Sequence, residues 1–329
     1  MPFQWIDGHL DLAYISMERG DIRTESADPS VRCVSLGALA RGHVGVIAAT
    51  IFVECGPDAT KHPWGYRDEN DWQGANRAAE LQMDYYESLE HAGLVRIVRN
   101  HAELVDDSLP RLLILMEGAD PIRDAGDVAR WHARGVRMVG LTWALGSRFA
   151  GGNHGGGGLT AAGREVVAAL DAHSILHDAS HLSDAAFDDL LAATTRTIVA
   201  SHSNARALMG SGERHIRDDQ IREIAKRGGV VGLNLYGKFL AVDRPATIDD
   251  AIDHLQHIAS VANSDTLNAL GSDLDGGFLP DKLPVPLHGP EQYSLLTDAL
   301  ARRGWSSDSC LKFASGNWLR VFAEALPNR

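Results

Sequence analysis

The sequence predicts an α/β fold, a closed (β/α)₈ TIM barrel in which residues 1–329 form a single domain. Short apolar runs alternate with amphipathic stretches along the whole chain, and about eight of these runs precede a helical stretch. A length of 329 residues suits one barrel, and a hydrophobic content of 44% can fill its core. A doubly wound sheet has the same alternation, but no GxGxxG motif follows the first strand, which weakens that alternative.

The first half of the chain contains long apolar runs with one clear helical repeat. A wholly apolar run at 112–116 is typical of a strand buried on both faces. The predicted strands here are 2–6, 44–53, 94–98, 112–116 and 136–142, and the predicted helices are 72–92 and 124–133.

The second half repeats the alternation more regularly. Thr160 and Ser183 stand where helix N-caps are expected, and Gly228 follows a helix as a stop signal. The glycine-rich run 151–158 is a flexible spacer or, less favoured, a mobile flap over a site. The predicted strands are 174–176, 197–200, 230–235 and 267–271, and the predicted helices are 160–172, 183–193, 217–226, 247–262, 291–302 and 307–325.

Composition and net charge limit the partners that we expect the protein to bind and the compartment in which we expect it. The net charge of −13 disfavours nucleic acid and anionic membranes as partners. Cys33, Cys55 and Cys310 are odd in number and scattered, so neither a disulfide framework nor a cysteine zinc site is expected. We see no signal peptide and no membrane-spanning run, so we expect a cytoplasmic protein, with a homodimer as a possible assembly.

Polar residues end several of the predicted strands, and all carboxyl ends of a parallel barrel surround one mouth. His9 and Asp11 are two residues apart, so in extended backbone they point to the same side. Imidazole and carboxylate are the ligands of catalytic Zn²⁺, and the carboxylate of Glu117 could join two metals. The candidates are His9, Asp11, Glu117, His181, His202 and Asp273.

Seven sequence motifs, in order, resemble those of the renal, or membrane, dipeptidase family. The resemblance extends from about Asp7 to Phe322 and implies a (β/α)₈ barrel with two zinc ions. The motifs are DGHLDLAY (7–14), MEG (116–118), DASH (178–181), SHSNARAL (201–208), RHIRDD (214–219), GSDLDG (271–276) and GNWLRVF (316–322).

The resemblance implies that five of these six candidates bind metal. His9 and Asp11 would hold one zinc, His181 and His202 would hold the other, and Glu117 would bridge them. Manganese or cobalt could replace zinc, because such sites accept several divalent ions.

The resemblance also implies roles in the hydrolysis of small dipeptides. Asp273 would shuttle protons, Arg214 would grip the substrate carboxylate, and Tyr236 would line the substrate pocket. From the residues themselves, Asp178 could orient His181 from behind.

One position departs from the family pattern. Where the family carries a histidine in an LTH motif, this chain has Trp143, which cannot polarise an oxygen as histidine can. His154 in the glycine-rich run could take over that role. Two alternatives therefore stay open: a binuclear metallohydrolase that acts on another amide or a lactone, and a non-catalytic barrel relative that binds a ligand.

Overall fold

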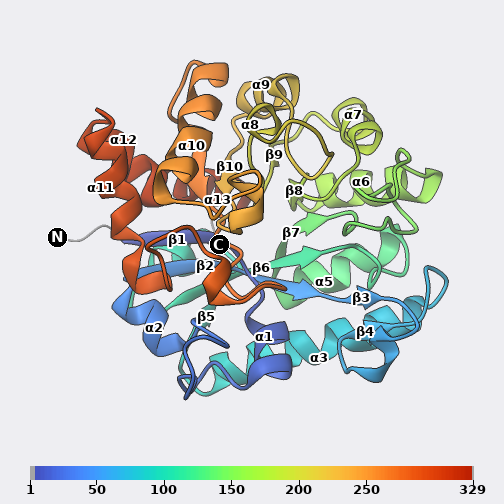
Figure 1. Cartoon of the computed structure of the whole chain (residues 1–329). Coiled ribbons are helices and arrows are strands. Elements are labelled where there is room, and N and C mark those ends of the chain that lie inside the picture. The colour runs from blue at the N-terminus through green and yellow to red at the C-terminus, as the bar shows by residue number, and fades with distance from the viewer. Residues whose placement is uncertain (1–3, 328–329) are drawn as a thin grey trace.

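Eight parallel strands form a barrel in the computed structural model, which describes residues 4–327. The order around the ring is β10-β11-β1-β2-β6-β7-β8-β9, and helices surround the strands in Figure 1, which confirms the predicted fold class. The ring strands are β1 (Trp5–Leu10), β2 (Val44–Phe52), β6 (Arg111–Glu117), β7 (Val136–Gly140), β8 (Leu176–Asp178), β9 (Ile198–Val199), β10 (Val231–Leu233) and β11 (Asn268–Leu270).

Three further short strands lie off the ring. The predicted strand 94–98 is present as β5 (Arg96–Ile97), but it pairs only with β6 and does not join the barrel path. β3 (Glu54–Cys55) and β4 (Gly65–Tyr66) form a separate two-stranded parallel sheet in the segment that follows β2.

The helices follow the predicted alternation, with short additions. The described helices are α1 (Leu12–Arg19), α2 (Leu36–Arg41), α3 (Trp72–His91), α4 (His101–Val105), α5 (Val128–Arg134), α6 (Ala161–Ala172), α7 (Asp184–Ala193), α8 (Arg206–Met209), α9 (Asp218–Lys226), α10 (Ile248–Ala262), α11 (Ser294–Arg302), α12 (Ser307–Leu311) and α13 (Asn317–Ala325). Among residues 4–327, no helix combines the length and apolar character needed to cross a bilayer.

Several predicted boundaries are wrong in detail. The first strand does not stop at Ile6 but continues to Leu10, so His9 lies on the strand itself. The predicted helix 307–325 contains a π-helical turn at Lys312–Gly316 between α12 and α13. The predicted caps are present, because the Thr160 and Ser183 side chains accept hydrogen bonds from Gly163 N and Ala186 N, each at 3.0 Å.

Close backbone contact completes the ring between β9 and β10. Ala200 pairs with Val231, and Gly232 N donates to Ala200 O at 2.8 Å. A Cβ added to Gly232 would lie 1.9 Å from the Ser201 carbonyl oxygen, and one added to Gly271 would lie 1.7 Å from the same atom. Glycine at both positions is therefore required for this approach.

The last helix fills one end of the barrel interior. Trp318 and Phe322 of α13 belong to the same apolar cluster as inward residues of the ring such as Leu113 and Val199. The Trp318 indole N–H donates to Leu270 O at 2.7 Å, so the ring is buried with its polar atom satisfied. This plug leaves the opposite, carboxyl end of the strands as the open mouth.

Replacing Gly232 with alanine should destabilise the protein by about 1–3 kcal/mol, because the new methyl group meets a backbone carbonyl that cannot rotate away. The measurement is urea unfolding followed by circular dichroism. Gly316→Ala is the control: its Cβ would come no closer than 3.7 Å to another atom, and alanine favours a helix. Equal unfolding midpoints for the two variants would contradict the role assigned to Gly232.

Candidate metal centre

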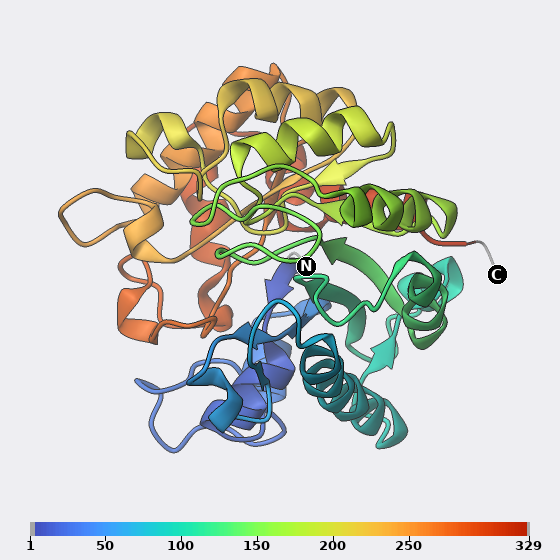
Figure 2. The same cartoon turned by 90° about the vertical axis from the view of Figure 1, so that its right-hand side faces the viewer.

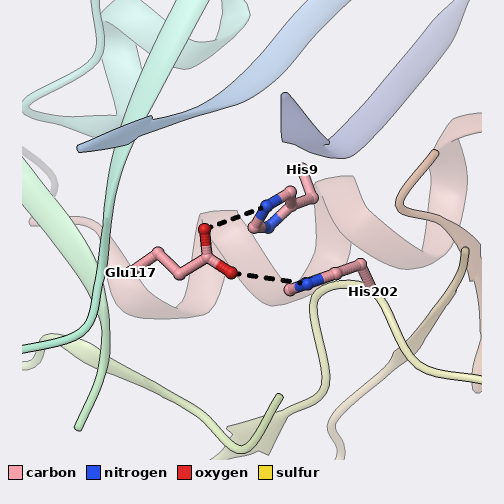
Figure 3. A group of neighbouring side chains, drawn as sticks. All are labelled: His9, Glu117 and His202. Atoms are coloured by element: carbon pink, nitrogen blue, oxygen red, sulfur yellow. Dashed lines mark ion pairs between the residues drawn. The ribbon is translucent and has the colours of Figure 1, made fainter. Parts of the chain in front are cut away.

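Three imidazole nitrogens converge on the two oxygens of one buried carboxylate. Glu117, the last residue of β6, has Oε2 at 3.5 Å from His9 Nε2 and Oε1 at 3.1 Å from His181 Nε2. The Nε2 atom of His202 lies 3.5 Å from Oε1, and Figure 3 shows His9 and His202 on opposite oxygens of Glu117. The carboxylate therefore faces one histidine with one oxygen and two histidines with the other.

The hydroxyl group of Ser201 fixes the far side of two of these rings. Ser201 Oγ donates its only proton to Asp178 Oδ2 at 2.5 Å. Its lone pairs then accept from His202 Nδ1 at 2.8 Å and from His9 Nδ1 at 3.2 Å. With Nδ1 donating in both rings, the Nε2 atoms are left facing Glu117.

The third ring is held from the glycine-rich loop. His181 Nδ1 donates to Asn153 Oδ1 at 3.2 Å, and Asn153 N donates back to His181 O at 2.8 Å. The loop is itself tied by backbone bonds between Gly151 N and Gly158 O and between Gly156 N and Gly152 O. Its glycines thus permit close backbone packing, and Figure 2 shows the green middle segment of the chain lying in front of the strands.

Two aspartates complete the cluster beside His9. Asp11 Oδ1 lies 3.8 Å from His9 Nε2 and accepts a hydrogen bond from the Thr50 hydroxyl. Asp273, which follows β11, accepts from Asn234 Nδ2 at 2.9 Å. Ligand atoms of His9, Asp11 and Asp273 lie within 4.8 Å of one another, as do those of His9, Glu117 and His202. Two overlapping groups suited to a cation therefore share His9.

Burial and charge shift the pKa values of the three histidines in opposite directions. Burial lowers the pKa of His9, but the Glu117 and Asp11 carboxylates outweigh it and raise the value to about 10. Burial and the Arg214 charge lower the pKa of His181 to about 4, and burial brings the pKa of His202 well below its usual value. The Nε2 atoms of these two neutral rings lie 3.0 Å apart.

The carboxylates are shifted as well. Burial raises the pKa of Asp273 to about 8 and that of Asp11 to about 6. For Glu117, burial opposes ionisation, but His9 and His181 hold its pKa below the usual range. Facing lone pairs and buried carboxylates repel one another unless a cation lies among them, so the donor set fits divalent metal ions of the zinc type.

A cavity of about 420 Å³ opens above the cluster. Arg214 lies on its wall, where the guanidinium donates to His202 O at 2.8 Å and to Ser203 Oγ at 3.2 Å. Tyr236 stacks on Phe278 with ring centroids 4.6 Å apart. Both aromatic side chains line the cavity, which can hold a ligand of a few residues at most.

Trp143 forms another part of the wall. Its ring lies 5.3 Å from Phe52 and 5.9 Å from His181, measured between centroids. The indole thus covers one face of His181 with an apolar surface. His154 also lines the cavity, from an exposed position in the glycine-rich loop.

The structure brings all of the predicted site residues to one mouth. His9 lies beneath the cavity, and the other candidates line it. Asp178 contacts Ser201 and makes no hydrogen bond to His181, so its expected support of His181 is replaced by support of His9 and His202 through Ser201.

Sequence reasoning missed the neutral residues that hold the charged and imidazole side chains of the site in place. The only sign of them in the sequence was that some stand next to a candidate histidine: Ser201 precedes His202, and Asn153 precedes His154. Serine, threonine and asparagine are common in loops, so their types alone carried no information. The missed residues are Thr50, Asn153, Ser201, Ser203 and Asn234.

Comparison with known proteins agrees with this geometry. Residues 2–328 match the family model described as membrane dipeptidase, peptidase family M19. The chain is 33% identical over 246 residues to an "uncharacterized protein in pqqA 5′region" of Klebsiella pneumoniae, covering 70% of this chain and 89% of that protein.

Two solved structures have the same fold. The dipeptidase AC, a metallopeptidase of family M19, superposes with a TM-score of 0.87 at 23% identity, covering 100% of both chains. A metallopeptidase from Rhodobacter sphaeroides, liganded with a phosphinate mimic of the dipeptide L-Ala-D-Ala, gives a TM-score of 0.87 at 24% identity, covering 98% of this chain and 99% of that one. Because the family model matches nearly the whole of this chain, the chain belongs to the membrane dipeptidase family, peptidase family M19.

Proposed function

We propose that this metallopeptidase is a zinc-dependent dipeptidase that holds two Zn²⁺ ions per chain and hydrolyses the peptide bond of small dipeptides. The observation that carries the proposal is the convergence of three histidine Nε2 atoms on the two oxygens of Glu117. His9 and Asp11 would hold one ion, His181 and His202 the other, and Glu117 would bridge them.

Bound zinc supplies a Lewis acid and lowers the pKa of a bound water towards ~7. The chain's own part is to aim the ligand atoms at the ions. Ser201 and Asn153 do this by occupying the Nδ1 atoms, so that each ring offers only Nε2 to an ion.

Asp273 is suited to carry a proton between water and the leaving amine. Its carboxylate lies within 4.8 Å of ligand atoms of His9 and Asp11, beside the proposed metal site, where it can accept a proton from water and release it to the amine. Asn234 holds one of its oxygens, which fixes the direction in which the carboxyl group faces.

Arg214 is suited to bind the carboxylate at the C-terminal end of a short substrate. A guanidinium presents paired donors that match a carboxylate, and Arg214 is already held in place by two hydrogen bonds. A longer peptide has no carboxylate at its second residue, so this contact favours dipeptides. The dipeptide mimic bound by the Rhodobacter sphaeroides relative supports a substrate of this size.

Zinc-loaded protein should hydrolyse members of a library of L,L and L,D dipeptides. Glu117→Gln should reduce that hydrolysis by more than ~100-fold, which is a larger effect than the loss of a residue that only supports a metal ligand. In the Glu117→Gln variant, the metal content measured by mass spectrometry should fall below the two zinc ions per chain expected for the wild type. Exposed Glu165→Gln is the control. If protein that holds two ions cleaves N-acyl amino acids or lactones but no dipeptide, the site is a hydrolase of another class, with Trp143 as the altered element.

Metal binding should release protons. At pH 7 His9 is protonated, because its pKa is about 10, whereas His181, with a pKa of about 4, is neutral. A metal that binds His9 must displace that proton, so the apparent affinity should rise about tenfold per pH unit between pH 6.5 and 8. Calorimetry in buffers of different ionisation enthalpy measures the release. Binding without release of a proton at pH 7 would count against His9 as a ligand.

Ser201→Ala should weaken zinc binding by about 10- to 100-fold, since His9 and His202 both lose the acceptor that fixes their tautomer. Competition with a chromogenic chelator measures the affinity. Ser203→Ala is a matched control from the same run of sequence, because Ser203 contacts Arg214 and no proposed ligand side chain. Equal affinities for the two variants would show that Ser201 has no orienting role.

A further inference from the structure

One acidic residue of the cavity wall has no part in the metal centre. Four carboxylates line the cavity: Asp11, Glu54, Glu117 and Asp273. All except Glu54 belong to the two groups whose ligand atoms lie together. Glu54 is half-buried, and within residues 4–327 no hydrogen bond or ion pair holds its carboxylate. A partly desolvated charge without a partner favours a cationic ligand.

The backbone under Glu54 is firmly placed. Glu54 forms β3 and pairs with Gly65 of β4, and its N–H donates to Trp64 O at 3.1 Å. The ring of Trp64 lies 5.1 Å from Tyr14, and Tyr14 lies 5.4 Å from Phe52, each in edge-to-face contact. An aromatic cluster therefore supports the strand that carries the carboxylate, which limits its movement.

Glu54 and Arg214 lie on opposite sides of the mouth. Glu54 lies two residues beyond the end of β2, whereas Arg214 donates to the carbonyl oxygen of His202, three residues beyond the end of β9. In the ring order, three strands separate β2 from β9 in either direction. The wall thus presents an unpaired anion and a cation at opposite ends of a cavity, with the ligand cluster between them.

We infer that Glu54 binds the α-ammonium group of the substrate and thereby restricts hydrolysis to peptides with a free N-terminus. This inference rests on the proposed dipeptidase function. A dipeptide is a zwitterion whose charged ends lie about 7 Å apart when extended, at 3.3–3.6 Å per residue. With its carboxylate on Arg214 and its ammonium on Glu54, its single peptide bond lies over the metal centre.

This arrangement discriminates between dipeptides and two other substrate classes, N-acyl amino acids and lactones. An N-acyl amino acid presents a carboxylate to Arg214 but no cation to Glu54, and a lactone presents neither charge. Such compounds would leave the Glu54 carboxylate desolvated and unpaired, which a site built around a charged contact rejects strongly.

The test compares alanyl-alanine, in its L,L and L,D forms, with propionyl-alanine, in which a hydrogen atom replaces the ammonium group. The zinc-loaded wild-type enzyme should favour alanyl-alanine in kcat/KM. Glu54→Gln should lower kcat/KM for alanyl-alanine about 10- to 100-fold, mainly through KM, and change propionyl-alanine less than threefold. Glu54→Asp, which keeps the charge, should retain part of the preference for alanyl-alanine over propionyl-alanine that Glu54→Gln loses. Glu69→Gln removes the same charge from an exposed position of the same segment and should leave the preference intact.

The possible outcomes separate this inference from the proposed function. If wild type cleaves alanyl-alanine but Glu54→Gln affects both compounds equally or neither, Glu54 does not bind the ammonium, although the dipeptidase stands. An effect confined to dipeptides with a basic first residue, such as lysyl-alanine, would assign Glu54 to a side-chain contact and overturn the inference. If wild type cleaves neither compound, the dipeptidase proposal fails, and the inference fails with it.

Discussion

The burial of the Glu117 carboxylate among three imidazole nitrogens is the constraint on which the rest of the mouth depends. A carboxylate that follows five consecutive apolar residues of a buried strand would be costly without opposite charge close by. The compensating groups come from β1 and from the loops that follow β8 and β9, which are distant in sequence. Only a closed ring brings those strand ends together, so barrel closure and charge compensation are one requirement.

Ser201 connects the closure of the ring to the orientation of the imidazole rings. Its carbonyl oxygen lies against Gly232 and Gly271 at the seam of the ring, and its hydroxyl group holds His9 and His202. A side chain at either glycine would displace the backbone that positions the hydroxyl group. The stability of the seam and the orientation of two imidazoles are therefore coupled through one residue, and Asp178 anchors that residue from behind.

The parts of the fold that the sequence predicted are the buried, periodic elements, whereas the parts that it did not predict are short helices and the pairing between strands. Apolar periodicity predicted the ring strands and the long helices, because burial on both faces leaves a plain mark in the sequence. The charged and imidazole ligands were recognised because each ends a buried strand abruptly. β5 was predicted as a strand, but a local pattern cannot tell which strands join the ring. Short helices such as α8 and α4 carry too few residues to show a period.

The supporting groups were hidden for another reason, which lies in the backbone. His181 and Asp273 have φ values of 67° and 60°, a left-handed region that non-glycine residues rarely adopt. Each costs of order 1–3 kcal/mol, and such strain persists only where the surroundings fix the conformation. Asn153 holds His181, and Asn234 holds Asp273. The sequence identified both residues as candidates for the site, but the strain that aims them, and the asparagines that oppose it, appear only when the strands have been placed in space.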